Sequence, residues 1–285
     1  MTLVKLGFLM VLSGLAPFGL GVLLARSSGY ALKTPVLILG TTAIAALTLA
    51  GLASRALYAP GEGRWPLPAE GPCKSWRLLA YISLALAGAV GVLLQTVWCT
   101  GDLTIPLGVL GILGGYFSFA PPLAWQRRGL GEAFGSLCFG LGAVFAGYYL
   151  QSSNLVTEIL VLGVPLTLAA FNFFFMLGFP PAGQKSWSRP FGLAERLGPV
   201  GAALLYTVIN ILTVVCLVFC LLFPASRLWP HHLLWSLILL ALVGQEMVKR
   251  RAYYHEARLR QLCWLSLALW WGMNLVFALI LGVRL

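Results

Sequence analysis

Charged residues are scarce in this chain: only 9% of its 285 residues are Asp, Glu, Lys or Arg. Soluble globular domains carry about 25%, so the low share excludes that class of protein. Intrinsic disorder is excluded as well, because disordered segments are poor in apolar residues and 60% of this chain is hydrophobic. The composition is typical of a chain that lies in a lipid bilayer.

Aspartate is nearly absent. Asp102 is the only aspartate, and the other seven of the eight acidic residues are glutamates. Mg²⁺ sites in proteins use hard oxygen ligands, chiefly carboxylates. A metal site built from several aspartates is therefore excluded anywhere in this sequence.

The six cysteines are spaced too irregularly for a known cysteine motif. No two of them form a Cys-x-x-Cys pair, and no Cys-x-x-Cys-His motif is present, which excludes c-type haem attachment. Most lie in or beside apolar segments, where cysteine behaves as a small hydrophobic residue. We expect neither a disulfide framework nor a bound metal at these positions.

Long apolar runs are what the chain has in abundance. Each is close to the roughly 20 residues that cross a bilayer as a helix, and continuous runs favour helices over the alternating strands of a membrane β-barrel. We therefore expect one all-α membrane domain over residues 1–285, a bundle of nine transmembrane helices. Their expected ranges are 6–25, 35–54, 78–98, 103–122, 131–150, 155–178, 199–223, 229–248 and 261–282.

Lysine and arginine are distributed unequally between the two ends of these segments. The side of the membrane with fewer basic residues would hold four of the nineteen lysines and arginines: Arg26, Lys33, Arg227 and Arg284. Because cytoplasmic loops carry the excess of basic residues, the pattern predicts a cytoplasmic N-terminus and an outside C-terminus. The long loops 55–77, 179–198 and 249–260 are then cytoplasmic, so we expect a functional site to open on that side. We attribute the net charge of +11 to these loops and to anionic lipid, and we expect no nucleic-acid partner.

The most informative stretch covers residues 116–151. Pro121 and Pro122 end the fourth apolar segment, and Gly129 allows a tight turn. Glu132 then falls in the first turn of the next helix, where the helix dipole favours an acidic side chain. A plain membrane hairpin would explain the charges here but not the whole string.

This string resembles the UbiA-type intramembrane prenyltransferases. The similarity is carried by Arg-Gly-Leu-Gly-Glu at 128–132, Tyr-Tyr-Leu-Gln at 148–151, Leu-Ala-Glu-Arg-Leu-Gly at 193–198 and Pro-Phe-Gly-Leu-Gly at 17–21. The branch that prenylates 1,4-dihydroxy-2-naphthoate for menaquinone is the most similar. The resemblance implies nine helices, a cytoplasmic N-terminus, and a site on the loops after the second and sixth helices.

The resemblance also implies a metal-dependent chemistry. In this family two aspartate-rich loops hold Mg²⁺, which binds a prenyl diphosphate whose ionisation yields a carbocation for an aromatic acceptor to attack. The resemblance places the first pair of aspartates at Ala56 and Ala59, and the second at Pro181 and Lys185. None of these four residues is acidic, so we interpret them as vestigial metal-motif positions.

Two functional hypotheses follow. We expect a non-catalytic relative that binds an isoprenoid, a quinone or a lipid, or that serves as a structural subunit of a membrane complex. The alternative is an active prenyltransferase of isoprenoid-quinone synthesis, with its diphosphate site rebuilt around Glu62, Glu70 or Glu195; only this hypothesis requires Mg²⁺. A transporter is less favoured, because no broken helix is paired with a buried ionisable residue near the middle of the membrane.

Several residues near the vestigial positions are candidate ligands for a polar or anionic head group. They are Arg55, Arg127, Arg128, Glu132, Asn172, Lys185 and Arg189. The alternative for the cations is that they enforce topology or bind lipid phosphates. We expect membrane lipids and other subunits of a membrane complex as partners, and the inner membrane of a bacterium as the location.

A pair of reporter fusions tests the predicted orientation. With nine crossings and a cytoplasmic N-terminus, alkaline phosphatase at the C-terminus should be active, because it reaches the outside. Green fluorescent protein at the same position should be dark, and both fusions within 249–260 should behave in the opposite way. A fluorescent C-terminal fusion would contradict the predicted orientation.

Overall fold

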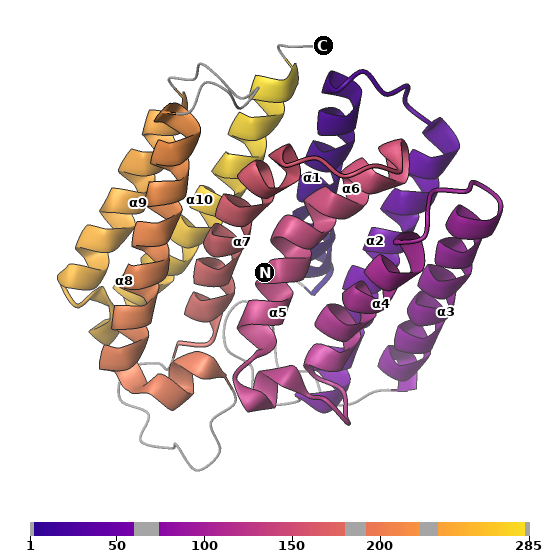
Figure 1. Ribbon diagram of the computed structural model, residues 1–285. Coiled ribbons are helices and arrows are strands. Elements are labelled where there is room, and N and C mark those ends of the chain that lie inside the picture. Colours follow the sequence, from indigo (N-terminus) through magenta and orange to yellow (C-terminus); the bar gives the residue numbers. More distant parts are fainter. Residues whose placement is uncertain (1–2, 60–73, 180–191, 223–232, 283–285) are drawn as a thin grey trace.

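A computed structural model describes residues 3–59, 74–179, 192–222 and 233–282, with side chains from Leu9 onward. Figure 1 shows these residues as one bundle of helices that run roughly along a common axis. The helices are α1 (Leu3–Ser27), α2 (Thr34–Tyr58), α3 (Lys74–Thr96), α4 (Thr104–Gly115), α5 (Gly131–Leu137), α6 (Ala143–Ser152), α7 (Glu158–Leu177), α8 (Leu193–Leu222), α9 (Leu233–Lys249) and α10 (Glu256–Gly282). Short 3-10 turns are η1 (Tyr116–Ser118), η2 (Trp125–Arg128) and η4 (Ala252–Tyr254), and the π-helical turn η3 (Cys138–Gly142) joins α5 to α6.

Within the described residues, each predicted apolar segment overlaps a helix. Among the described residues, seven spans are long and apolar enough to cross a membrane, with α5, η3 and α6 forming one of them. The apolar helix Thr104–Ser118 is shorter, and α9 has 17 described residues. The fold is therefore an all-α membrane fold, while the count of nine crossings and the orientation of the termini stay predictions.

Two helix ends differ from the predicted boundaries. Helix α2 continues to Tyr58, so that Arg55 and Ala56 lie in its last turns rather than in a loop. Helix α8 begins at Leu193, ahead of the predicted start, and is kinked at Gly198 (φ 70°, ψ 169°). The kink has a local cause, because Pro199 disfavours the α conformation in the residue before it and glycine tolerates the resulting backbone.

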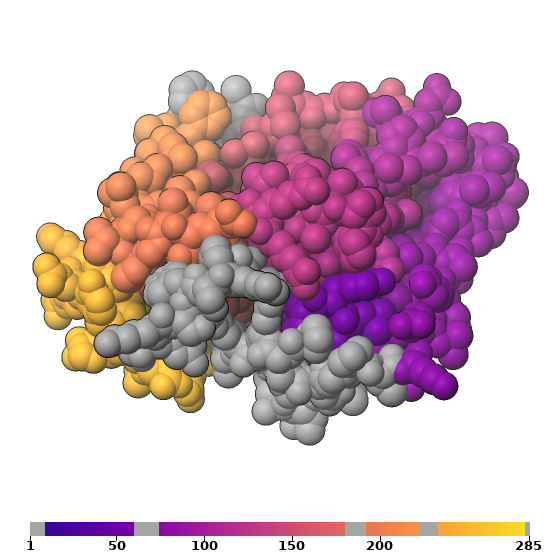
Figure 2. All heavy atoms as spheres, turned by 90° about the horizontal axis from the view of Figure 1, so that it is seen from below, coloured from indigo at the N-terminus to yellow at the C-terminus, as the bar shows by residue number. Residues whose placement is uncertain are grey.

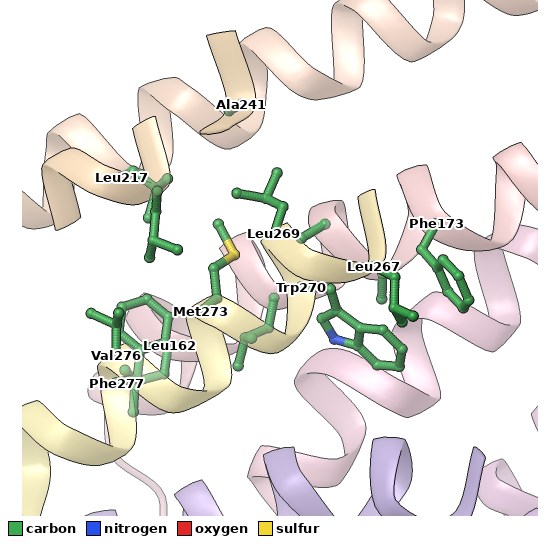
Figure 3. Packing of buried hydrophobic residues seen from close by; sticks show 14 of the residues in the cluster. Leu162, Phe173, Leu217, Ala241, Leu267, Leu269, Trp270, Met273, Val276 and Phe277 are labelled. Carbon is green, nitrogen blue, oxygen red and sulfur yellow. The ribbon is translucent and has the colours of Figure 1, made fainter. Parts of the chain in front are cut away.

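The main hydrophobic core is built by α1 and α6 to α10. Figure 3 shows Leu269, Trp270, Met273 and Phe277 of α10 facing Phe173 and Leu162 of α7 and Leu217 of α8. Smaller clusters join α2 to α3 and α4. The first and last helices are also linked, since Trp271 Nε1 donates a hydrogen bond to Ser13 Oγ at 3.1 Å.

Helices α1 and α6 meet at two glycines. A Cβ atom on Gly147 would lie 2.0 Å from the carbonyl oxygen of Phe18, and one on Gly21 would lie 2.0 Å from that of Val144. Small residues of this kind let membrane helices approach each other closely. The contact fixes α6, and hence the α5 end of the same span, against the N-terminal helix.

Substitution at this contact should destabilise the bundle. Gly147→Ala forces α1 and α6 apart, and overpacking of this kind costs about 1–3 kcal/mol. We expect a lower melting temperature in detergent. Gly88→Ala on α3 is the matched control, because a Cβ there meets nothing within 4 Å. Equal melting temperatures for the two variants would contradict the close contact.

Candidate functional site

One end of the bundle collects most of the candidate residues that the structure describes. Here α2 and α7 end, α5 and α8 begin, and residues 125–132, which we call the central turn, lie among them. Figure 2 views the molecule from this end and shows the central turn in magenta between the orange start of α8 and the indigo end of α2. The backbone bends sharply here, with φ 42° at Ala124 and φ 78° at Gly129.

The central turn and the preceding segment are fastened to the end of α2. Arg127 Nη2 donates to the carbonyl oxygen of Tyr58 at 2.9 Å. Ser54 Oγ donates to the carbonyl oxygen of Tyr116 at 2.6 Å, and the guanidinium of Arg55 lies 5.9 Å from the centre of the Phe119 ring, a cation–π distance. The end of α2, where Ala56 lies in the last turn and Ala59 directly follows the helix, is therefore held in place by protein contacts.

The central turn is also fastened to the start of α8. Glu132 Oε1 accepts two hydrogen bonds, from Gln126 Nε2 at 2.9 Å and from the backbone N–H of Leu193 at 3.1 Å. The Arg196 guanidinium donates to the carbonyl oxygen of Arg127. One short turn thus links α2 to α8.

Glycines make room for these bonds. A Cβ atom on Gly192 would lie 2.6 Å from Glu132 Oε1, and one on Gly178 would lie 3.3 Å from the same oxygen. A Cβ on Gly131 would lie 2.0 Å from Gln126 Oε1. The Arg-Gly-Leu-Gly-Glu string at 128–132 thus forms a turn in which Glu132 accepts a hydrogen bond from Gln126 of the same turn.

Glu132 is almost completely buried, with 2% of its surface exposed. Its second oxygen, Oε2, makes no hydrogen bond to any residue that the structure describes. A buried polar atom without a partner is costly, and more so for a charged group. One oxygen of this carboxylate therefore holds the helices together, and the other is an unused acceptor.

The predicted cations of the central turn are bonded to backbone. Arg127 reaches Tyr58, and Arg128 Nη2 donates to the carbonyl oxygen of Pro122 at 3.3 Å. The structure thus brings Arg55, Arg127, Arg128 and Glu132 to one end of the bundle. Lys185, Arg189 and the vestigial position Pro181 lie outside the described residues.

Asn172 is placed differently from the other candidates. It is 1% exposed on α7, and neither amide atom has a partner in the described part of the chain. Phe174 is partly exposed and packs on the Phe139 ring that follows α5. At 100° per residue, Asn172 points about 200° away from Phe174 around the helix, so the structure does not bring its amide to the face that packs against Phe139.

Gln126 and Arg196 belong to the site although the sequence pattern does not single them out. Both lie within or next to strings that carry the family resemblance, which is the only signal that points to them. Their partners are a side chain six residues away and a backbone carbonyl 69 residues away. A contact between residues so far apart in the sequence, such as that of Arg196, is created by the fold.

The residues of the described site do not fit a two-Mg²⁺ centre. Mg²⁺ requires near-octahedral oxygen ligands, whereas Ala56 and Ala59 offer methyl groups. No group of three or more His, Cys, Asp or Glu side chains suited to a metal occurs within the described ranges. Glu62 and Glu70 lie outside these ranges, and Glu195 in the first turn of α8 has an interaction of its own.

The opposite end of α6 has a structural role. Tyr149 Oη accepts a hydrogen bond from the backbone N–H of Leu103 at 3.2 Å, and Gln151 Oε1 accepts one from Lys33 at 2.9 Å. The Tyr-Tyr-Leu-Gln string therefore ties down two loops at the end away from Glu132. Asp102, next to Leu103, lies at that end as well.

Comparison with known proteins identifies the fold. No protein-family model and no curated protein matches the sequence. Among solved structures, the apo structure of a UbiA homologue from Aeropyrum pernix K1 superposes with a TM-score of 0.65 at 18% identity, covering 96% of each chain. This chain therefore has the UbiA fold and is an integral membrane protein.

Removing the Glu132 side chain should weaken the joint between α5 and α8. Glu132→Ala leaves Gln126 Nε2 and the Leu193 N–H without their acceptor, which costs about 1–3 kcal/mol. The melting temperature in detergent should fall. Glu246→Ala is the control, because Glu246 on α9 forms an exposed ion pair with Arg250, the residue after the helix; this change should leave the melting temperature unchanged. A Glu132→Ala variant as stable as this control would contradict the structural role of the carboxylate.

Proposed function

We propose that this protein is a UbiA-fold membrane protein that binds an isoprenoid, a quinone or another lipid without catalysing metal-dependent prenyl transfer. It would act as a binding protein or as a subunit of a membrane complex in the inner membrane of a bacterium. One observation carries the proposal. At the end of the bundle where the resemblance implies two aspartate motifs, Ala56 lies in the last turn of α2 and Ala59 directly follows it, and the buried carboxylate of Glu132 holds helices together.

The interior next to this end suits an apolar chain. The Phe139 and Phe174 rings, which are both partly exposed, lie 5.4 Å apart between ring centres. Phe139 follows Glu132 by seven residues, which is roughly 10 Å along a helix. An isoprenoid chain on this aromatic wall would gain about 25 cal/mol per Å² of apolar surface buried.

The basic residues of this end support a position at the membrane surface. Arg127 and Arg128 are the last two residues of η2 and are exposed, and Arg196 lies in the first turn of α8. Under the predicted orientation they face the cytoplasm, where lipid head groups are anionic. Binding of a head group by Lys185 and Arg189 belongs to the same proposal.

A direct assay separates this proposal from the enzyme hypothesis. The protein in nanodiscs, given Mg²⁺, a polyprenyl diphosphate and 1,4-dihydroxy-2-naphthoate, should form no prenylated product, because the carboxylates that would hold the metal are missing. An active prenyltransferase in the same nanodiscs is the positive control. Extraction of the purified protein should yield an isoprenoid, quinone or lipid in stoichiometric amount.

The contrary result is equally concrete. A Mg²⁺-dependent product that disappears in Glu62→Ala, Glu70→Ala or Glu195→Ala would establish a rebuilt active site and overturn the proposal.

A further inference from the structure

We propose that Glu132 selects the ligand of this bundle by accepting a hydrogen bond from a hydroxyl group at the polar end of an isoprenoid lipid. The inference rests on the proposed function and specifies the chemistry of the ligand. In this assignment the protein offers the ligand a hydrogen-bond acceptor, whereas a diphosphate-binding site offers positive charge.

The first step concerns the cations. Arg127, Arg128 and Arg196 each donate to a backbone carbonyl oxygen of the turn region or of the adjoining helix end. These bonds fasten the central turn to α2 and to α8. The guanidinium groups of this turn are therefore oriented by the fold toward the protein backbone.

The second step concerns the unused acceptor. With its Oε1 bonded to Gln126 and Leu193, the carboxylate of Glu132 is fixed in orientation. Its Oε2 is buried and makes no hydrogen bond to any residue in the described ranges. A carboxylate oxygen accepts hydrogen bonds, and a buried one that has no donor is costly. A hydroxyl group satisfies this oxygen, whereas a diphosphate is repelled by it.

The third step concerns the apolar part of the ligand. Glu132 Oε1 lies 3.3 Å from the Cβ position of Gly178, the residue that ends α7. Phe171 and Phe174 precede Gly178 with helical spacing, and all three are partly exposed. Phe139 packs against Phe174 from the span that begins beside Glu132. The carboxylate of Glu132 thus lies beside the residue that ends α7, on the helix face that carries Phe171 and Phe174, which fits a ligand with a hydroxyl head and an isoprenoid tail.

Glu132→Gln tests this assignment without breaking the joint. Glutamine keeps one oxygen for Gln126 and Leu193, but it replaces Oε2 by an amide nitrogen that donates instead of accepting. The probes are geranylgeraniol, geranylgeranyl diphosphate and a quinol with a tail of the same length. Affinity for the protein in nanodiscs is measured by native mass spectrometry.

The wild-type protein should bind geranylgeraniol or the quinol at least tenfold more tightly than the diphosphate. Glu132→Gln should weaken binding of the hydroxyl ligand about tenfold or more, the loss expected for one hydrogen bond to a charged acceptor. The hydroxyl probe that binds more tightly shows whether the ligand is an isoprenoid alcohol or a quinol. Asp102→Asn makes the same chemical change at the opposite end of the bundle and should have no effect on binding.

Two results would overturn the inference alone: a diphosphate that binds the wild-type protein as tightly as the alcohol, or a Glu132→Gln variant that melts normally and binds the hydroxyl ligand unchanged. Absence of binding by all three probes would instead overturn the proposed function on which the inference rests.

Discussion

A buried carboxylate joins the parts of this bundle. Glu132 stands at the start of α5, and one of its oxygens accepts hydrogen bonds from Gln126 and from the first backbone N–H of α8. Because this oxygen is shielded from water, its donors are fixed protein groups, and these two bonds position the central turn. Arg127, in the same turn, binds the last residue of α2. The geometry of this end depends on one acidic side chain and the turn that presents it.

This arrangement holds one end of a UbiA fold together through the protein's own hydrogen bonds. The two helices that would carry the aspartates, α2 and α7, end at the same place, and the protein's own hydrogen bonds fix the surrounding segments. Ala56 and Ala59 contribute no charge to this end of the bundle. The interior next to this end is apolar and aromatic, and Oε2 of Glu132 has no hydrogen-bond partner among the described residues, which supports the proposed binding role.

Much of the fold could be predicted from the sequence, because a lipid environment restricts long apolar runs to helices. The end of α2 and the start of α8 were harder to predict, because long-range hydrogen bonds of Arg127 and Glu132 stabilise these helix ends and the local sequence does not reveal them. Glu132 was predicted as a first-turn acid, but its partner is the backbone N–H of Leu193, 61 residues away; any residue except proline offers such a donor. The position of Asn172 was equally hidden, because hydropathy alone does not show which face of an apolar helix packs against its neighbours.

The most direct test of this account is an experimental density map of the protein in nanodiscs, purified with no ligand added. We predict chain-like density along Phe139 and Phe174 that ends within hydrogen-bonding distance of Glu132 Oε2, with the carboxylate bonded to Leu193. Density for a diphosphate with paired metal ions, coordinated by Glu62, Glu70 or Glu195, would contradict it.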